Sequence, residues 1–222
     1  MLDIWRNAGY PLGNHGYDHL NLNRAKTIAA WTADVVAGEP MVAKHMTGRD
    51  WHYYRFPNLA AGTGERHIAA ADVLKTRRYR VADVSIAFSD WVYTDAYVRC
   101  LARGDQTSIA AMKVQYLRGV DDGIAQMKAV SRRVYGRVIP QVLLMHLGGW
   151  SAVTLPGVMA RLDRAGARYV TLKRAQADAA YAYANKLPGG GSILQRTAKA
   201  NKLDVSDIVK LKSVIDVKQI CR

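Results

Sequence analysis

Short apolar runs alternate with longer segments of helical periodicity through most of the chain, and this alternation limits the possible folds. We predict strands at 52–56, 80–88, 138–145 and 168–172. We predict helices at 25–37, 65–76, 94–102, 108–133 and 155–165, the first of them ending at Gly38-Glu39-Pro40. The pattern favours an α/β fold with a parallel sheet and crossover helices, either open or closed into a barrel.

Composition indicates a globular chain with a basic surface. The sequence has 222 residues, of which 50% are apolar, so it can bury a sizeable core. The net charge of +14 favours anionic partners: nucleic acid, envelope polymers or acidic lipid heads. The only cysteines, Cys100 and Cys221, exclude a cysteine-rich zinc ribbon but could pair once in an oxidising compartment. We expect no transmembrane segment, since no apolar run approaches about 20 residues.

Polar or aromatic residues follow several of the predicted strands. In parallel α/β folds, functional groups collect at the C-terminal ends of strands. Pro11-Leu12 leads into a histidine, and the predicted strands 52–56, 80–88 and 138–145 lead into polar, titratable or aromatic groups. The residues at these four ends are His15; Asn58, after Arg55; Asp90 with Trp91; and His146. We therefore expect them on one rim.

His15 and His19 form the most suggestive pair. In a helical turn, positions i and i+4 share a face, so both imidazoles could bind one cation. Surface histidines or hydrogen-bonded core histidines are the alternative interpretation. A zinc site would also require a third protein ligand, usually a carboxylate beside two histidines.

Taken together, "GNHGYDHLNL", "YYRFPNLAAG", "SDW" and "LLMHLGGW" resemble the second to fifth motifs of the polysaccharide deacetylases, carbohydrate esterase family four. The resemblance covers residues 1–172. It implies a distorted (β/α) barrel and metal-dependent hydrolysis of N-acetyl groups on a polysaccharide such as chitin-type oligomers or peptidoglycan. We expect a deacetylase-like domain over 1–185, and a basic extension over 186–222 after a Gly-rich linker.

The resemblance also implies residue roles. His15 and His19 would bind a divalent metal ion, with zinc expected. Arg55 would orient the catalytic base, and the backbone N–H of Asn58 would stabilise the oxyanion. In the second half, Asp90 would orient His146, the general acid; Trp91 would form a groove wall, and Leu144 and Leu147 would shape the acetyl pocket. Structural roles remain open: an ion pair for Arg55, a cap for Asp90, a core aromatic for Trp91 and a core histidine for His146.

The family's first motif, Thr-Phe-Asp-Asp, which supplies the base and the carboxylate ligand, is absent, and Asp3 is the only acidic residue before His15. We expect a deacetylase domain without its first strand and favour a fragment, or a gene model begun at an internal Met, of a working enzyme. A degenerate relative that binds polysaccharide or holds metal weakly, and a basic module for nucleic acid or envelope polymers, are the alternatives.

The expected partner is an N-acetylated polysaccharide rather than a specific nucleic acid. We see no signal peptide here, but expect an extracytoplasmic location for the parent protein. The oligomeric state stays open.

Overall fold

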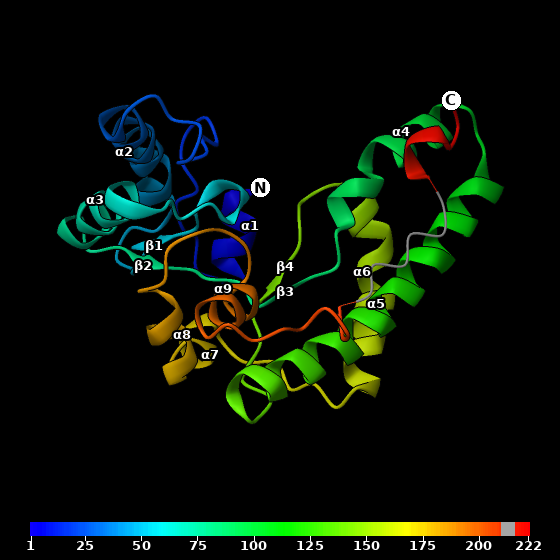
Figure 1. Cartoon of the computed structure of the whole chain (residues 1–222). Coiled ribbons are helices and arrows are strands. Elements are labelled where there is room, and N and C mark those ends of the chain that lie inside the picture. Colours follow the sequence, from blue (N-terminus) through cyan, green and yellow to red (C-terminus); the bar gives the residue numbers. More distant parts are fainter. Residues whose placement is uncertain (210–215) are drawn as a thin grey trace. The chain divides into compact units, whose positions relative to one another are not determined.

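The computed structural model describes residues 1–209 and 216–222 (Figure 1). Contacts group the chain into two compact units: unit 1 comprises Met1–Asp83 and Ala179–Ala200, and unit 2 comprises Val84–Asp178 and Asn201–Arg222. Helix accounts for 56% and strand for 5%, so the fold is mixed α/β and mostly helical. This confirms the general α/β class. The described residues contain no closed barrel.

Unit 1 is built around a small parallel sheet. β1 (Tyr53–Tyr54) pairs in parallel with β2 (Arg80–Val81), and Asn14 forms a parallel bridge with Tyr54. The other elements are α1 (Leu2–Asn7), α2 (Ile28–His45), η1 (Pro57–Leu59), α3 (Gly64–Thr76), α8 (Ala179–Ala184) and α9 (Ile193–Ala200). The core contains large aromatic and aliphatic side chains, including Trp31, Val35, Tyr54, Phe56, Leu74 and Tyr79.

The predicted end of the first long helix is wrong. α2 begins after Thr27, whose Oγ1 accepts the Ala30 N–H at 3.1 Å, and runs through Pro40 to His45. A proline inside a helix removes one hydrogen bond and costs about 3 kcal/mol. The buried face of α2 extends as far as Gly38, beside Asn14, so tertiary packing extends this helix beyond the predicted break.

Unit 2 combines two short parallel strands with long helices. β3 (Ile86–Ala87) pairs with β4 (Leu143–Leu144). The helical elements are η2 (Asp90–Tyr93), α4 (Thr94–Ala102), α5 (Gln106–Tyr135), α6 (Gly149–Arg164), α7 (Leu172–Ala175) and η3 (Val217–Gln219). The bounds of α4 are those predicted from the sequence. α5 passes without a break through Gly119 and Gly123, because Met112, Tyr116, Val120 and Ile124 form one buried face at intervals of four residues.

All four predicted strands differ from the structure in extent or in kind. The runs 52–56 and 138–145 shorten to the two-residue strands β1 and β4. The run 80–88 is divided into β2 and β3, and the Ala82 C=O between them accepts a bond from Arg55 Nε instead of continuing the ladder. The segment 168–172 forms no strand. Tyr169 and Val170 are about half exposed there, and a strand needs a partner as well as β propensity. α6 starts earlier than predicted, at Gly149.

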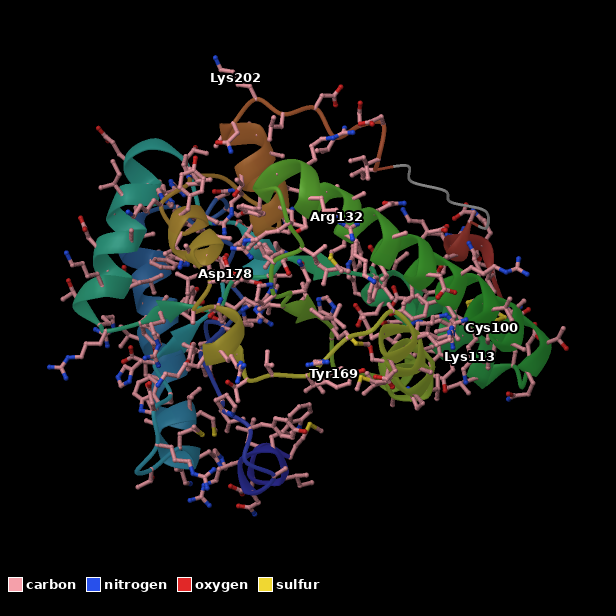
Figure 2. The ribbon with its side chains drawn as sticks, turned by 90° about the horizontal axis from the view of Figure 1, so that it is seen from below. Cys100, Lys113, Arg132, Tyr169, Asp178 and Lys202 are labelled. Atoms are coloured by element: carbon pink, nitrogen blue, oxygen red, sulfur yellow. A yellow bond between two sulfur atoms is a disulfide. The ribbon has the colours of Figure 1, made fainter. Side chains whose placement is uncertain are left out.

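A disulfide joins Cys100 of α4 to Cys221 in unit 2 (Figure 2). Arg99, next to Cys100, donates to the backbone carbonyls of Val217 at 3.3 Å and Ile220 at 3.0 Å. These contacts hold residues 216–222 against α4. The pairing that the sequence left open is therefore present in the structure.

Residues 188–192, predicted as a flexible Gly-rich linker, lie in unit 1. The Ala61 N–H donates to the Gly189 C=O at 2.9 Å, and the Gly189 N–H donates to the Gly62 C=O at 2.6 Å. The following helix α9 buries Ile193 and Leu194, while Lys199 is exposed. An extension beginning at residue 186 stays a prediction. Among the residues described, no helix combines the length and the apolar character needed to span a bilayer.

Candidate active-site residues in the two units

The first histidine follows directly on the sheet of unit 1. The Asn14 N–H donates to the Tyr53 C=O at 2.7 Å, and the Arg55 N–H donates to the Asn14 C=O at 3.0 Å. The buried Asn14 side chain donates from Nδ2 to the Val35 C=O and to the Tyr79 hydroxyl, each at 2.8 Å. His15 is therefore attached to a residue whose backbone and side chain are both fixed.

The His15 and His19 rings lie together, with centroids 4.8 Å apart and planes at 81°. His15 Nδ1 is 2.6 Å from the Arg55 carbonyl oxygen. Since a carbonyl can only accept, Nδ1 carries the proton, and Nε2 of the neutral ring carries the lone pair that can bind a cation.

The expected helical turn is wrong: the segment is a loop, and His19 has a left-handed backbone with φ 55°. The structure thus brings the two predicted ligands together by a different local conformation.

No prediction from the sequence included Asp34, a buried residue on α2. Its carboxylate accepts hydrogen bonds from the backbone N–H groups of Asp18 and Leu20, the residues before and after His19. A signal was present: Asp34 shares a helix face with Trp31 and Val35, which are both apolar. A carboxylate on a core-facing stripe needs hydrogen-bond donors.

Arg55 lies in a partly buried charged cluster of unit 1. Its Nε donates to the Ala82 C=O at 3.0 Å. Burial lowers the pKa of the Arg55 guanidinium, and the negative charge of Asp83 opposes that shift. Asp83 itself accepts from Arg196 at 2.6 Å, and burial raises the pKa of its carboxyl group against the opposing charges of Arg196 and Arg55. The acidic group that acts on Arg55 within this unit is thus Asp83.

Asn58 occupies an exposed turn after Pro57. Its backbone is left-handed, with φ 56° and ψ 21°, and its Oδ1 accepts from Asn21 Nδ2 at 2.9 Å. Asparagine tolerates this conformation better than bulky residues do. An asparagine therefore suits this position. The proposed oxyanion role of its backbone N–H stays a prediction.

In unit 2, Asp90 and His146 contact each other as expected. Asp90 Oδ1 lies 3.0 Å from His146 Nδ1, and Oδ2 accepts the His146 backbone N–H at 2.7 Å. The Asp90 side chain is 1% exposed and the His146 side chain 48%, so a buried carboxylate holds an accessible imidazole. Ser151, which sequence reasoning missed, donates a third bond to Asp90 at 2.8 Å. Its only signal was its place directly after "LLMHLGGW".

The apolar residues expected to contact substrate differ in exposure. Trp91 is 60% and Leu147 73% exposed, whereas Leu144 in β4 is partly buried. Trp91 is therefore not a core aromatic. The core tryptophan of this region is Trp150, which stacks on Tyr93 with centroids 5.0 Å apart.

The metal donors are incomplete in the part of the chain that the structure describes. No group of three or more His, Cys, Asp or Glu residues there could hold an ion. His15 and His19 suit zinc by ligand type but make only two of the three protein ligands that a catalytic site uses. Asp3, the acidic residue that precedes them, contacts His45 at 2.7 Å.

The hollow of about 600 Å³ beside α2 and α3 contains none of the predicted site residues. It is lined by Ile28, Ala29, Thr32, Ala33, Val36, Ala37, Ala69 and Val73. This lining has no titratable group, so the hollow offers no acid–base chemistry. The chemistry-bearing residues lie outside it.

Comparisons with protein-family models, with curated proteins and with solved structures found no match to this chain.

Proposed function

We propose that this chain belongs to a metal-dependent hydrolase that removes N-acetyl groups from a polysaccharide. One observation carries the proposal: His15 and His146 are each held through Nδ1 by an acceptor, the Arg55 carbonyl and the Asp90 carboxylate. In both rings Nε2 is then the working nitrogen, as a cation ligand in unit 1 and as a proton donor in unit 2. These are the roles that the motif resemblance implies.

In unit 1, His15 and His19 would hold the cation. A bound zinc ion polarises the substrate carbonyl and lowers the pKa of its water. The two imidazoles do not complete such a site alone, and the resemblance places the third ligand in a Thr-Phe-Asp-Asp motif that the printed sequence lacks. Arg55 would orient the base of that motif, and the Asn58 N–H would face the oxyanion.

In unit 2, His146 would donate a proton. As the C–N bond breaks, the proton moves from Nε2 of the imidazolium to the departing amine nitrogen. The buried Asp90 carboxylate would accept from Nδ1–H and hold the orientation of the ring. Exposed Trp91 and Leu147, with Leu144, would offer apolar contacts to the sugar and its acetyl group.

The finer fold and the location are part of the same proposal. We place the chain in the distorted (β/α) barrel class of the deacetylases, supported by the parallel pairing of β1 with β2 and of β3 with β4. The Cys100–Cys221 disulfide supports an extracytoplasmic, oxidising compartment. An N-acetylated polysaccharide is the proposed partner rather than a specific nucleic acid.

Zinc affinity, measured with a competing chelator, and acetate release from N-acetylglucosamine oligomers and from peptidoglycan test the proposal. We expect weak zinc binding and little turnover by the printed chain, because the carboxylate ligand is missing. His15→Ala and His19→Ala should each lower zinc affinity at least tenfold, whereas His52→Ala, on a ring stacked against Trp51, should not. Robust acetate release that survives His15→Ala would refute the proposal.

The DNA upstream of the Met1 codon offers a separate test. An in-frame Thr-Phe-Asp-Asp and signal sequence would support a longer working enzyme, and the longer protein should then bind zinc tightly and release acetate. Finding neither would refute the fragment hypothesis. Salt-dependent DNA binding without glycan binding would favour a basic nucleic-acid module instead.

A further inference from the structure

Asp34 is a buried acidic residue to which the proposed mechanism gives no role. It lies in the second turn of α2 and is 7% exposed, on the same buried face as Trp31 and Val35. A carboxylate in a core is costly unless its oxygens accept hydrogen bonds. The donors that it uses come from the histidine loop, residues 15–20.

Three backbone N–H groups of the histidine loop point at this one residue. The Asp18 N–H donates to Asp34 Oδ1 at 2.7 Å, and the Leu20 N–H donates to Oδ2 at 3.4 Å. The Tyr17 N–H donates to the Asp34 main-chain carbonyl at 3.1 Å. The backbone N–H groups of the residues before and after His19 therefore both donate to the Asp34 carboxylate.

Gly16 makes this arrangement sterically possible. Its φ of +79° is a left-handed value, and a Cβ built at this position would overlap Asp34 Oδ2. A glycine thus lets the carboxylate approach the loop directly after His15. His19 is also left-handed, with φ 55°, a conformation that a non-glycine residue keeps only when its surroundings enforce it.

We propose that Asp34 is a positioning residue that sets the His15–His19 pair in place for cation binding before any cation arrives. The inference rests on the proposed function only for the purpose of the pair. α2 supplies a rigid support, the carboxylate fixes the backbone on both sides of His19, and the Arg55 carbonyl fixes the His15 ring. Held in this way, the two rings lie with their centroids 4.8 Å apart.

Two measurements on the printed chain test this proposal without substrate. Nuclear Overhauser contacts between the His15 and His19 rings report the preset pair in metal-free protein, and chelator competition reports zinc affinity. Asp34→Asn offers one oxygen where two N–H groups need acceptors, so we expect the ring contacts to disappear and zinc affinity to fall about 10–100-fold. Gly16→Ala should have the same effect with the Asp34 carboxylate chemically intact.

Matched variants separate positioning from general stability. Val35→Ala truncates the neighbouring buried residue of α2 and should lower the melting temperature while leaving ring contacts and zinc affinity unchanged. Asp72→Asn, on the exposed surface of α3, should leave the melting temperature, the ring contacts and the zinc affinity unchanged. Slow amide exchange of Asp18 and Leu20 in the unsubstituted chain supplies a measurement that does not depend on any variant folding.

The proposal is overturned if folded Asp34→Asn keeps the ring contacts and a zinc affinity within twofold of the parent. Fast exchange of the Asp18 and Leu20 amides in the parent would also overturn it. If the parent chain binds no zinc, the metal-free ring contacts decide the question alone. If the ring contacts and the zinc affinity of the printed chain are as expected, but a longer protein that carries the Thr-Phe-Asp-Asp motif releases no acetate, the result would count against the proposed function and leave the role of Asp34 standing.

Discussion

The Asp90 carboxylate contacts His146 at two points: Oδ2 accepts the backbone N–H at 2.7 Å, and Oδ1 lies 3.0 Å from the ring Nδ1. One carboxylate thus fixes both the position of the residue and the tautomer of its ring. Because the Asp90 side chain is 1% exposed and the His146 side chain 48% exposed, the pair combines a buried orienting carboxylate with a ring that solutes can reach.

Asp90→Asn should reverse the His146 tautomer. The side chain of asparagine has a single acceptor oxygen, and the His146 backbone N–H competes for it. When the oxygen accepts from the backbone, the amide NH2 group faces Nδ1, and Nδ1 loses its acceptor. Nitrogen chemical shifts of the His146 ring should report the change. In a longer protein that deacetylates glycan, kcat should fall about 10²–10⁴-fold. Unchanged ring shifts would contradict the orienting role, and Asp95→Asn on α4 serves as the control.

Ser151→Ala should loosen the dyad without removing it. The hydroxyl donates to Asp90 Oδ2 at 2.8 Å, and a hydrogen bond to a charged group contributes about 1.5–3 kcal/mol. We expect the free energy of unfolding of unit 2 to fall by about that amount, measured by urea denaturation, with the His146 tautomer retained. Ser151→Thr keeps the hydroxyl and should restore most of the loss; a loss equal to that of Ser151→Ala would argue against the hydrogen bond as its cause.

Asp83 should make the stability of unit 1 fall as pH rises. Burial raises its folded-state pKa above the ordinary value of 3.8. Between 3.8 and the higher folded value, the folded chain keeps a proton that the unfolded chain has released, so the folded state loses relative stability across that window.

The contribution of Asp83 can be isolated from that of the other carboxylates by comparison with Asp83→Asn. Urea denaturation followed by NMR signals of unit 1 should show the parent losing stability relative to Asp83→Asn as pH rises above about 3.8. Asp72→Asn should run parallel to the parent. A difference that stays constant, or grows in favour of the parent, would show that the folded-state pKa is not raised.

Breaking the disulfide should destabilise unit 2. The bond closes a separation of 121 residues, and loss of such a link costs about 2–5 kcal/mol. We expect reductant to lower the melting temperature of the parent, and Cys221→Ser to lower it similarly in the absence of reductant. Cys221→Ser should then be insensitive to reductant. Two free thiols in the unreduced parent would show that the pair does not form in solution.

Local sequence patterns predicted some elements well. α4 has its predicted bounds, and α3 differs by one residue, since apolar periodicity and turn residues act within a few positions. The short contact of Asp90 with His146 was also expected, but only from the motif resemblance. For elements such as α2, which continues past Pro40, buried contacts with residues distant in sequence outweighed the local signal.

By itself, the sequence determined the α/β class, the basic charge and the positions of the residues able to do chemistry. The tertiary structure decided which of these residues meet. His15 and His19 come together through a loop held by Asp34, not through a helical turn. Arg55 interacts with the charge of Asp83, and Asp83 also accepts a hydrogen bond from the buried Arg196. The physical reason is that periodicity fixes which face of an element is apolar, whereas the partners of a buried polar group come from distant parts of the chain.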